Sequence, residues 1–359
     1  MKLFKLRTLR GKIINTNIFK DMNTNNTPVK LFITGATGYI GGSALSKLLQ
    51  TSQKGKYDIT VLTRSETTVP KFKELGVNVL IGDLDSADLL TQAAIDSDAV
   101  LNFAHADHLP AVKAFIKGLN TNDGKRRIFI HTSGTSVLAD RAMGAYASET
   151  IYNDTDIETI HALPLTQPHK DVDSYIFENN QNFDSIIVAP PTIYGLGTGP
   201  FNRHSGQVPG LTRAFIKAGK AGTVGKGLNK WSNVHIDDFT NFSAFLLEKA
   251  LEGNASVGYN GWYFCRTGEH VWRDINLKIA EELHKHKAII SPDVVEFTNE
   301  EIDSFIGHLA WHAFGSNSRS RSDRALQLGW KPNEHNPNIF ETIAEEVKTI
   351  LEEAHKKTN

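Results

Sequence analysis

The sequence contains very little cysteine and no long hydrophobic run. Only one of its 359 residues is a cysteine, Cys265, so no disulfide can form within the chain and nothing indicates an oxidising compartment. No apolar stretch approaches the roughly 20 residues that a membrane-spanning helix needs. The formal net charge is −1, which gives no general preference for nucleic acid or anionic membranes. We therefore expect a cytoplasmic protein with no nucleic-acid or membrane partner.

Acidic residues are absent from the first twenty positions. Residues 1–20 contain lysine, arginine, leucine and isoleucine but neither aspartate nor glutamate. A basic, acid-free and amphipathic start is typical of a mitochondrial transit peptide, although this one lacks serine. Mitochondrial targeting is therefore an alternative to the cytoplasm. An extended basic tail over residues 1–28 and a start at Met22 are also open.

From residue 29 onward, short β-branched runs alternate with helical periods. Strands are predicted at 29–35, 57–64, 77–83, 98–104, 126–133 and 184–191, with helical segments between most of them. Such alternation indicates βαβ units, which form a parallel sheet covered by helices on both faces. The predicted fold class is therefore α/β, with a doubly wound parallel sheet.

Three glycines follow the first predicted strand at intervals of three residues. In the stretch LFITGATGYIGG, Gly35 permits a tight turn, Gly38 lets the backbone approach a pyrophosphate, and Gly41 lets the helix pack closely on the strand. The free N–H groups at the start of that helix would face the phosphates. A strand before the glycines and a helix after them form the context that a dinucleotide site requires. The predicted contacts from this turn are Gly35, Thr37, Gly38, Tyr39 and Ile40.

The end of the second predicted strand indicates which dinucleotide is bound. NAD-preferring sites commonly place an acid there to hold the ribose hydroxyls, whereas this chain has Thr63 and Arg64. The guanidinium of Arg64 can pair with a 2′-phosphate, so we predict NADP and leave NAD open. After the third strand, Asp83 is placed to accept a hydrogen bond from the adenine amino group, although it could instead cap a helix. Leu84 follows it and completes the predicted adenine contacts.

Several segments together resemble the short-chain dehydrogenase/reductase superfamily. They are TGATGYIGG, GDLDS at 82–86, APPTIYGLG at 189–197, WSNVHIDDFTNFSAFLLEKAL at 231–251 and RSDRALQLGWKP at 321–332. They are similar to its extended branch of sugar-nucleotide epimerases and dehydratases, to dihydroflavonol-reductase-like enzymes and to atypical relatives. The resemblance covers residues 29–350 approximately.

The resemblance implies a division of the chain and further site residues. It implies a dinucleotide-binding Rossmann domain over 29–190 and a mixed substrate lobe over 191–350, from which 261–268 returns to the sheet. The loop after the fourth strand lies beside the cofactor in relatives, so Ala104 and His105 join the predicted cofactor contacts. Because relatives often dimerise through helices that flank the sheet, a homodimer is possible.

The chain lacks the Tyr-x-x-x-Lys pair with which the hydride-transferring members of that superfamily work. In them the lysine lowers the tyrosine pKa and holds the nicotinamide ribose, and a Ser or Thr follows the fifth strand. None of the eight tyrosines here has lysine four residues later. The Ser/Thr position is present in HTSGTS, where we favour Ser133. The helix that normally carries the pair reads HKDVDSYIFEN, with His169 and Lys170 near the tyrosine position and Asp173 one turn later.

Three hypotheses follow from this departure. In the first, Lys170 holds the nicotinamide ribose while Tyr146 or His169 donates the proton. In the second, the chain resembles nitrogen-metabolite-repressor-like sensors, which bind NADP without redox chemistry. In the third, other groups carry out cofactor-dependent chemistry. The sequence favours an NAD(P)-dependent oxidoreductase or epimerase-like enzyme for a small carbonyl or alcohol. Its predicted catalytic residues are Ser133, Tyr146 and Lys170, and no metal site is predicted.

Overall fold

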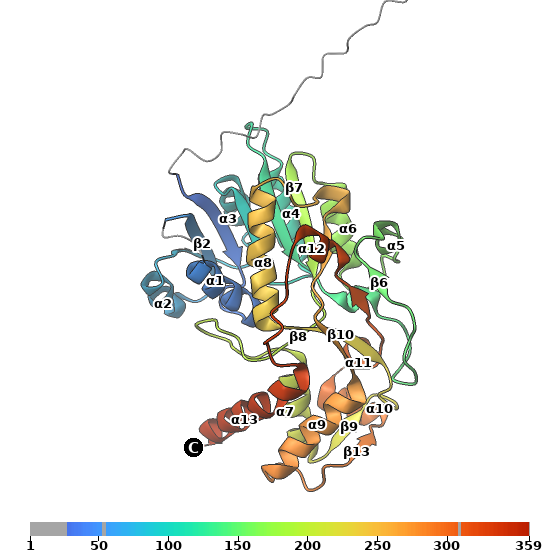
Figure 1. Cartoon of the computed structure of the whole chain (residues 1–359). Coiled ribbons are helices and arrows are strands. Elements are labelled where there is room, and N and C mark those ends of the chain that lie inside the picture. The colour runs from blue at the N-terminus through green and yellow to red at the C-terminus, as the bar shows by residue number, and fades with distance from the viewer. Residues whose placement is uncertain (1–26, 52–54, 308–309, 359) are drawn as a thin grey trace, which may run out of the picture.

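The computed structural model describes residues 27–51, 55–307 and 310–358 (Figure 1). The basic segment at 1–20 and the alternative start at Met22 lie outside these ranges. No helix within them is long and apolar enough to cross a lipid bilayer.

A seven-stranded parallel sheet forms the upper half of the molecule in Figure 1. The strand order is β11-β7-β5-β4-β1-β2-β3, and every neighbouring pair is parallel. Because β1 pairs with β2 on one side and with β4 on the other, the winding direction changes beside β1. The predicted α/β doubly wound sheet is confirmed. Its strands are β1 (Val29–Thr34), β2 (Tyr57–Thr63), β3 (Asn78–Ile81), β4 (Ala99–Asn102), β5 (Arg127–Thr132), β7 (Phe183–Ala189) and β11 (Trp262–Phe264).

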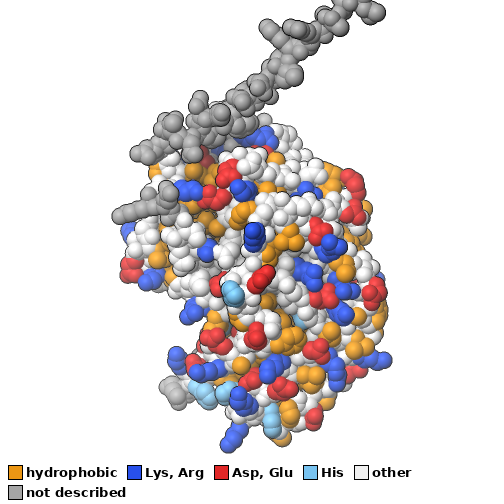
Figure 2. All heavy atoms as spheres, viewed as in Figure 1, with side chains coloured by type: hydrophobic (Ala, Val, Ile, Leu, Met, Phe, Trp, Pro, Cys, Tyr) orange, Lys and Arg blue, Asp and Glu red, His pale blue; other side chains and the backbone are white. Residues whose placement is uncertain are grey.

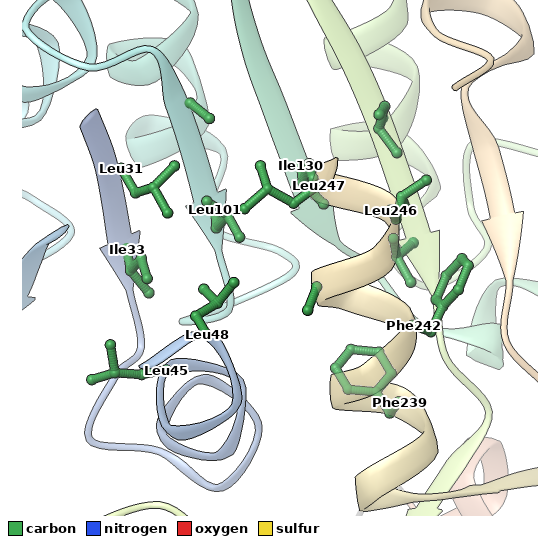
Figure 3. Packing of buried hydrophobic residues seen from close by; sticks show 14 of the residues in the cluster. Leu31, Ile33, Leu45, Leu48, Leu101, Ile130, Phe239, Phe242, Leu246 and Leu247 are labelled. Atoms are coloured by element: carbon green, nitrogen blue, oxygen red, sulfur yellow. The ribbon is translucent and has the colours of Figure 1, made fainter. Parts of the chain in front are cut away.

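Helices cover both faces of this sheet because consecutive strand residues point to opposite sides. On β1, Leu31 and Ile33 pack toward α1 and α8, as Figure 3 shows, whereas Phe32 belongs to the apolar cluster of the opposite face. The first face carries α1 (Tyr39–Thr51), α2 (Val69–Glu74) and α8 (Ile236–Leu251). The second face carries α3 (Ala87–Ile95), α4 (Leu109–Leu119) and α6 (Lys170–Glu178).

A smaller mixed lobe lies below the carboxyl ends of the strands (Figure 1). Its apolar core includes Phe215, Trp272 and Ile343. Strand β11 lies within the segment predicted to return to the large sheet and pairs there with β7. The face in Figure 2 intersperses acidic and basic side chains, in keeping with the small net charge. The lobe contains α7 (Gln207–Ala218), α9 (Trp272–Lys285), α13 (Ile339–Thr358), the sheet β8 (Thr192–Tyr194), β10 (Lys230–His235) and β12 (Gly268–Val271), and the pair β9 (Ala221–Thr223) and β13 (Val294–Glu296).

Short elements connect the two parts. The 3-10 turn η2 (Thr135–Leu138) and the helix α5 (Ile157–His161) follow β5, and β6 (Tyr152–Asn153) pairs with β14 (Ser320–Arg321). The helix α12 (Asp323–Leu328) begins next to β14.

The third glycine of the first turn yields a test of the close packing between α1 and β1. In a Gly41→Ala variant the new Cβ would lie 2.4 Å from the backbone carbonyl oxygen of Gly35, which cannot rotate away as a side chain could. We expect the free energy of unfolding to fall by about 1–3 kcal/mol in chemical denaturation. Gly210→Ala in α7 is the matched control, because no atom lies within 4 Å of its added Cβ. It should be neutral or gain up to about 1 kcal/mol, and equal losses in both variants would contradict the packing argument.

Candidate cofactor and catalytic site

The turn between β1 and α1 is built around a close backbone contact. Gly35 has a φ of +79°, and a Cβ there would lie 2.6 Å from the carbonyl carbon of Phe103 and 2.7 Å from the amide nitrogen of Ala104. The amide of Gly38 donates to the carbonyl oxygen of Gly35 at 2.8 Å, which closes the turn. A side chain at position 35 would therefore separate the exits of β1 and β4, so glycine is required here for steric as well as conformational reasons.

A cavity of about 410 Å³ opens at this turn, over the carboxyl ends of β1 to β4. This is the switch point at which doubly wound sheets bind their ligands. Of the ten predicted cofactor contacts, all except Tyr39 and Ile40 line it. The lining residues fit a dinucleotide, because the glycine turn, the exposed cation Arg64 and the carboxylate of Asp83 all face the same cavity. The lining residues are Gly35, Thr37, Gly38, Leu62, Thr63, Arg64, Gly82, Asp83, Leu84, Asp85, Phe103, Ala104, His105 and His108.

The side chains of Tyr39 and Ile40 support the turn from behind. The hydroxyl of buried Tyr39 donates to the carbonyl oxygen of Gly195 at 2.7 Å, and Ile40 packs against the core cluster of α1. Neither side chain lines the cavity. Any contact of these two residues with a phosphate would therefore come from their backbone amides.

Two charged side chains face the end of the cavity predicted to hold adenine. Arg64 is exposed and forms no hydrogen bond or ion pair with any residue that the structure describes. Asp83 accepts hydrogen bonds from the Ser86 hydroxyl at 2.8 Å and from the Asp85 amide at 3.1 Å. The Ser86 bond holds the pKa of Asp83 below its ordinary value. Asp83 thus closes the turn before α3, which is the structural role considered from the sequence as an alternative to binding adenine. It also lines the cavity.

A hydrogen-bonded chain of aspartate, histidine and serine lies next to the cofactor loop. His169 places Nδ1 2.5 Å from Asp107 Oδ1 and Nε2 2.6 Å from Ser136 Oγ. Asp107 belongs to the loop between His105 and His108, both of which line the cavity. A Cβ at Gly134 would lie 3.1 Å from His169 Nε2, so the glycine leaves this nitrogen room.

The carboxylate of Asp107 favours the protonated form of His169. Burial alone lowers the pKa of this histidine, but the hydrogen bond and charge of Asp107 outweigh that effect, so the pKa is raised. The same bond lowers the pKa of Asp107. His169 was one of two proton donors considered from the sequence, whereas Ser136 and Asp107 were missed. They are 33 and 62 residues away in the chain, so no local spacing could have indicated them.

Ser133 is bonded to the residue that stands where the family lysine was expected. Its hydroxyl lies 2.8 Å from Oδ2 of Asp173, and both side chains are buried. Burial raises the pKa of Asp173 to about 7. His169 and Asp173 are one helical turn apart, so both meet the segment that follows β5. A histidine and an aspartate therefore occupy the places expected for tyrosine and lysine.

The other two predicted catalytic residues have different surroundings. Lys170 is buried, and its Nζ donates to the carbonyl oxygen of Ile160 in α5 at 3.1 Å. Burial also lowers the pKa of its ammonium group. Tyr146 is 49% exposed, and its backbone carbonyl accepts from Asn317 at 3.2 Å. To hold a ribose, the Lys170 side chain would have to give up its hydrogen bond to the carbonyl oxygen of Ile160. The Tyr146 hydroxyl has no hydrogen-bond partner among the described residues.

Comparisons with known proteins agree with this architecture. The profile of a family described as NAD(P)H-binding matches residues 35–205. The oxidase ucsJ of an Acremonium species is 30% identical over 351 residues, which cover 91% of this chain and 98% of that protein. A 4-hydroxy-2-methyl-3-oxo-4-farnesyl-3,4-dihydroquinoline-1-oxide ketoreductase of Stigmatella aurantiaca is 24% identical over 177 residues, 46% of this chain and 51% of that one.

A solved structure shares the fold over nearly its whole length. A double mutant of dTDP-glucose 4,6-dehydratase from Streptomyces venezuelae, with NAD bound, superposes with a TM-score of 0.60. The match covers 89% of this chain and 95% of that one at 17% identity. Together with the glycine turn and the sheet order, these matches confirm the resemblance seen in the sequence. The chain belongs to one family with the oxidase ucsJ and contains an NAD(P)-binding Rossmann domain, and its fold is that of the epimerase/dehydratase-type structures.

Proposed function

We propose that this protein is an NADP(H)-dependent oxidoreductase that interconverts a small carbonyl compound and its alcohol, with His169 as the proton donor. The observation that carries the proposal is the hydrogen-bonded chain Asp107–His169–Ser136 beside the loop that lines the cofactor cavity. Two relatives, an oxidase and a ketoreductase, support oxidoreduction. The homodimer and the cytoplasmic location remain predictions.

The chain's own groups supply the acid–base part of such a reaction. A bound nicotinamide supplies or accepts the hydride. Protonated His169 donates from Nε2 to Ser136 Oγ, and the Ser136 hydroxyl passes a proton to the oxygen of the reduced carbonyl. Asp107 holds the Nδ1 proton and stabilises the imidazolium. The histidine thereby does the work of the missing tyrosine, while the charge on Asp107 tunes its pKa as the missing lysine would tune that of tyrosine.

The preference for NADP is based on the end of β2. Arg64 is exposed and lines the cavity, and Ser65 and Thr67 follow it with hydroxyl oxygens 2.7 Å apart. β2 ends with Thr63 and not with the acid typical of NAD sites. A 2′-phosphate beside this cation would gain a charge-assisted hydrogen bond.

Replacement of Arg64 tests the cofactor preference. Arg64→Ala should weaken NADPH binding by about 1–3 kcal/mol and leave NADH binding nearly unchanged, because NADH has no 2′-phosphate. Isothermal titration calorimetry with both cofactors measures this. Lys71→Ala is the matched control, since Lys71 is an exposed cation on α2 that pairs with Glu74 outside the cavity. Equal losses for NADPH and NADH would overturn the assignment.

Replacement of Asp107 tests the electrostatic support of His169. In Asp107→Asn the amide oxygen can still accept from Nδ1 but carries no charge, so the largest raising effect is weakened and the His169 pKa should fall relative to wild type. Titration of the histidine side chains by NMR measures this shift. Asp85→Asn, which removes the partner of His108 in the same cavity, should leave the His169 titration unchanged. An unchanged pKa in Asp107→Asn would refute the pairing.

The stability of the wild type should follow the same pair. Because the folded-state pKa of His169 is raised, the stability that it contributes is present below 6.5 and is lost as the pH rises through the raised value. The stability difference between wild type and Asp107→Asn should therefore shrink as the pH rises above neutrality. Thermal denaturation over a pH series measures this trend.

Activity distinguishes His169 from Tyr146 as the proton donor. NADPH oxidation should be followed against a panel of aldehydes and ketones. His169→Gln should lose about 10²–10⁴-fold in kcat with NADPH affinity unchanged, whereas Tyr146→Phe should keep wild-type turnover. The reverse pattern would reassign the donor to Tyr146. Tight NADPH binding without turnover across the whole panel would favour the NADP sensor instead.

A further inference from the structure

A chain of buried polar groups crosses the sheet next to the proposed acid. Thr34 ends β1, Asn102 ends β4, His131 lies in β5, and Asp173 on α6 then connects to Ser133. None of these side chains is more than 7% exposed. Each hydrogen bond in such a chain joins one donor to one acceptor. A group that can only donate, such as a backbone amide, therefore fixes the direction of the hydrogen bonds that follow it along the chain.

That obligatory donor is the backbone amide of Ala104. It donates to Asn102 Oδ1 at 3.3 Å, and the Thr34 hydroxyl donates to the same oxygen at 2.6 Å. These two donors show which side-chain atom of Asn102 is the amide oxygen. The amide nitrogen of Asn102 then lies 3.0 Å from Nδ1 of His131. Because an amide nitrogen can only donate, Nδ1 accepts, and neutral His131 carries its proton on Nε2.

The protonated edge of His131 faces Asp173. Nε2 lies 4.0 Å from Asp173 Oδ1, which has no hydrogen-bond partner among the described residues, and the backbone of Ala106 also bonds this ring and raises the pKa of His131. The Nε2–H dipole of His131 favours an unprotonated Oδ1 on Asp173. When the Asp173 carboxyl carries a proton, that proton therefore lies on Oδ2. Oδ2 is the oxygen that lies 2.8 Å from the Ser133 hydroxyl.

We infer that Asp173 is a positioning residue that acts as a neutral acid, donating from Oδ2 to Ser133 Oγ so that the Ser133 proton is free to bond a substrate oxygen. An ionised Asp173 would instead accept that proton, and Ser133 would then present only lone pairs, which repel a carbonyl oxygen. The consequence for turnover rests on the proposed function, whereas the direction of the hydrogen bonds does not.

The electrostatic surroundings are consistent with a neutral carboxyl. Burial raises the pKa of Asp173 to about 7, against the opposing effects of the Ser133 bond and the charges of His169 and Lys170. The charge of Asp107 raises it further. Burial also lowers the pKa of His131 to about 3, so the neighbouring ring is neutral and does not pull the proton from the carboxyl.

The proton positions can be measured without a substrate. Histidine-labelled NMR at about pH 6 should find His131 neutral with its proton on Nε2, and infrared spectroscopy should find a protonated carboxyl band that Asp173→Asn removes. Asp154→Asn is the matched control. Asp154 is a buried aspartate with a pKa near 6 that accepts from the amides of Phe264 and Arg324, so its replacement should leave the Asp173 band in place. A His131 proton on Nδ1, or an ionised Asp173 at this pH, would overturn the inference.

The pH profile with a carbonyl from the panel tests the effect on turnover. In wild type two groups, His169 and Asp173, must be protonated, so log kcat/KM should fall with a slope approaching two at alkaline pH. Asp173→Asn mimics the neutral acid, because its amide nitrogen can donate to Ser133 and its oxygen faces His131. Its slope should be one with kcat at about pH 6 largely kept, whereas Asp173→Ala should lose at least tenfold. Equal slopes in wild type and Asp173→Asn would overturn the positioning role. If no carbonyl is turned over, the proposed function fails while the spectroscopic result still decides the hydrogen-bond directions.

Discussion

The close backbone contact between the exits of β1 and β4 is the constraint on which the site depends. Gly35 approaches Phe103 and Ala104 so tightly that a Cβ would overlap their backbone. This contact holds the glycine turn against the loop that contains His105 and Asp107, and the cofactor cavity opens between them. The same loop then reaches His169 through Asp107. The cavity and the proposed proton donor are therefore connected through the exit of β4.

The replacement of tyrosine and lysine by histidine and aspartate changes how charge is arranged in the site. A lysine on α6 would place a positive charge in this part of the site, whereas here Asp107, from another loop, pairs with His169 and raises its pKa. The ionised form of Asp173 on α6 is energetically unfavourable, because the side chain is fully buried and has no cation in hydrogen-bond contact. Burial raises its pKa to about 7. In the proposed reaction this carboxyl is a second group whose protonation matters, and the proton transfer proceeds with the charges distributed differently from those of a tyrosine and lysine pair.

The fold was predicted largely from local patterns, and the reason is visible in β1 and α1. Alternate residues of β1 enter two different apolar clusters, which requires the continuous apolar run seen in the sequence. The cavity lining was also largely anticipated, because strand exits in a parallel sheet meet at one edge. Tyr39 and Ile40 are exceptions, since their side chains pack behind the turn. The surroundings of the predicted catalytic residues could not be anticipated, because the contacts of Tyr146 with Asn317 and of Lys170 with Ile160 join segments that no local spacing relates.

The α/β class, the glycine turn and the lack of the usual catalytic pair could all be read from the amino-acid order, because each is expressed within a few neighbouring residues. The groups proposed to act in place of that pair could be found only in three dimensions. Asp107, Ser136 and His169 come from three separate segments, and their contacts exist because β4 and β5 are neighbours in the sheet and α6 packs against them. The direction of the buried hydrogen bonds was likewise decided in three dimensions, since it starts from one backbone amide at the exit of β4.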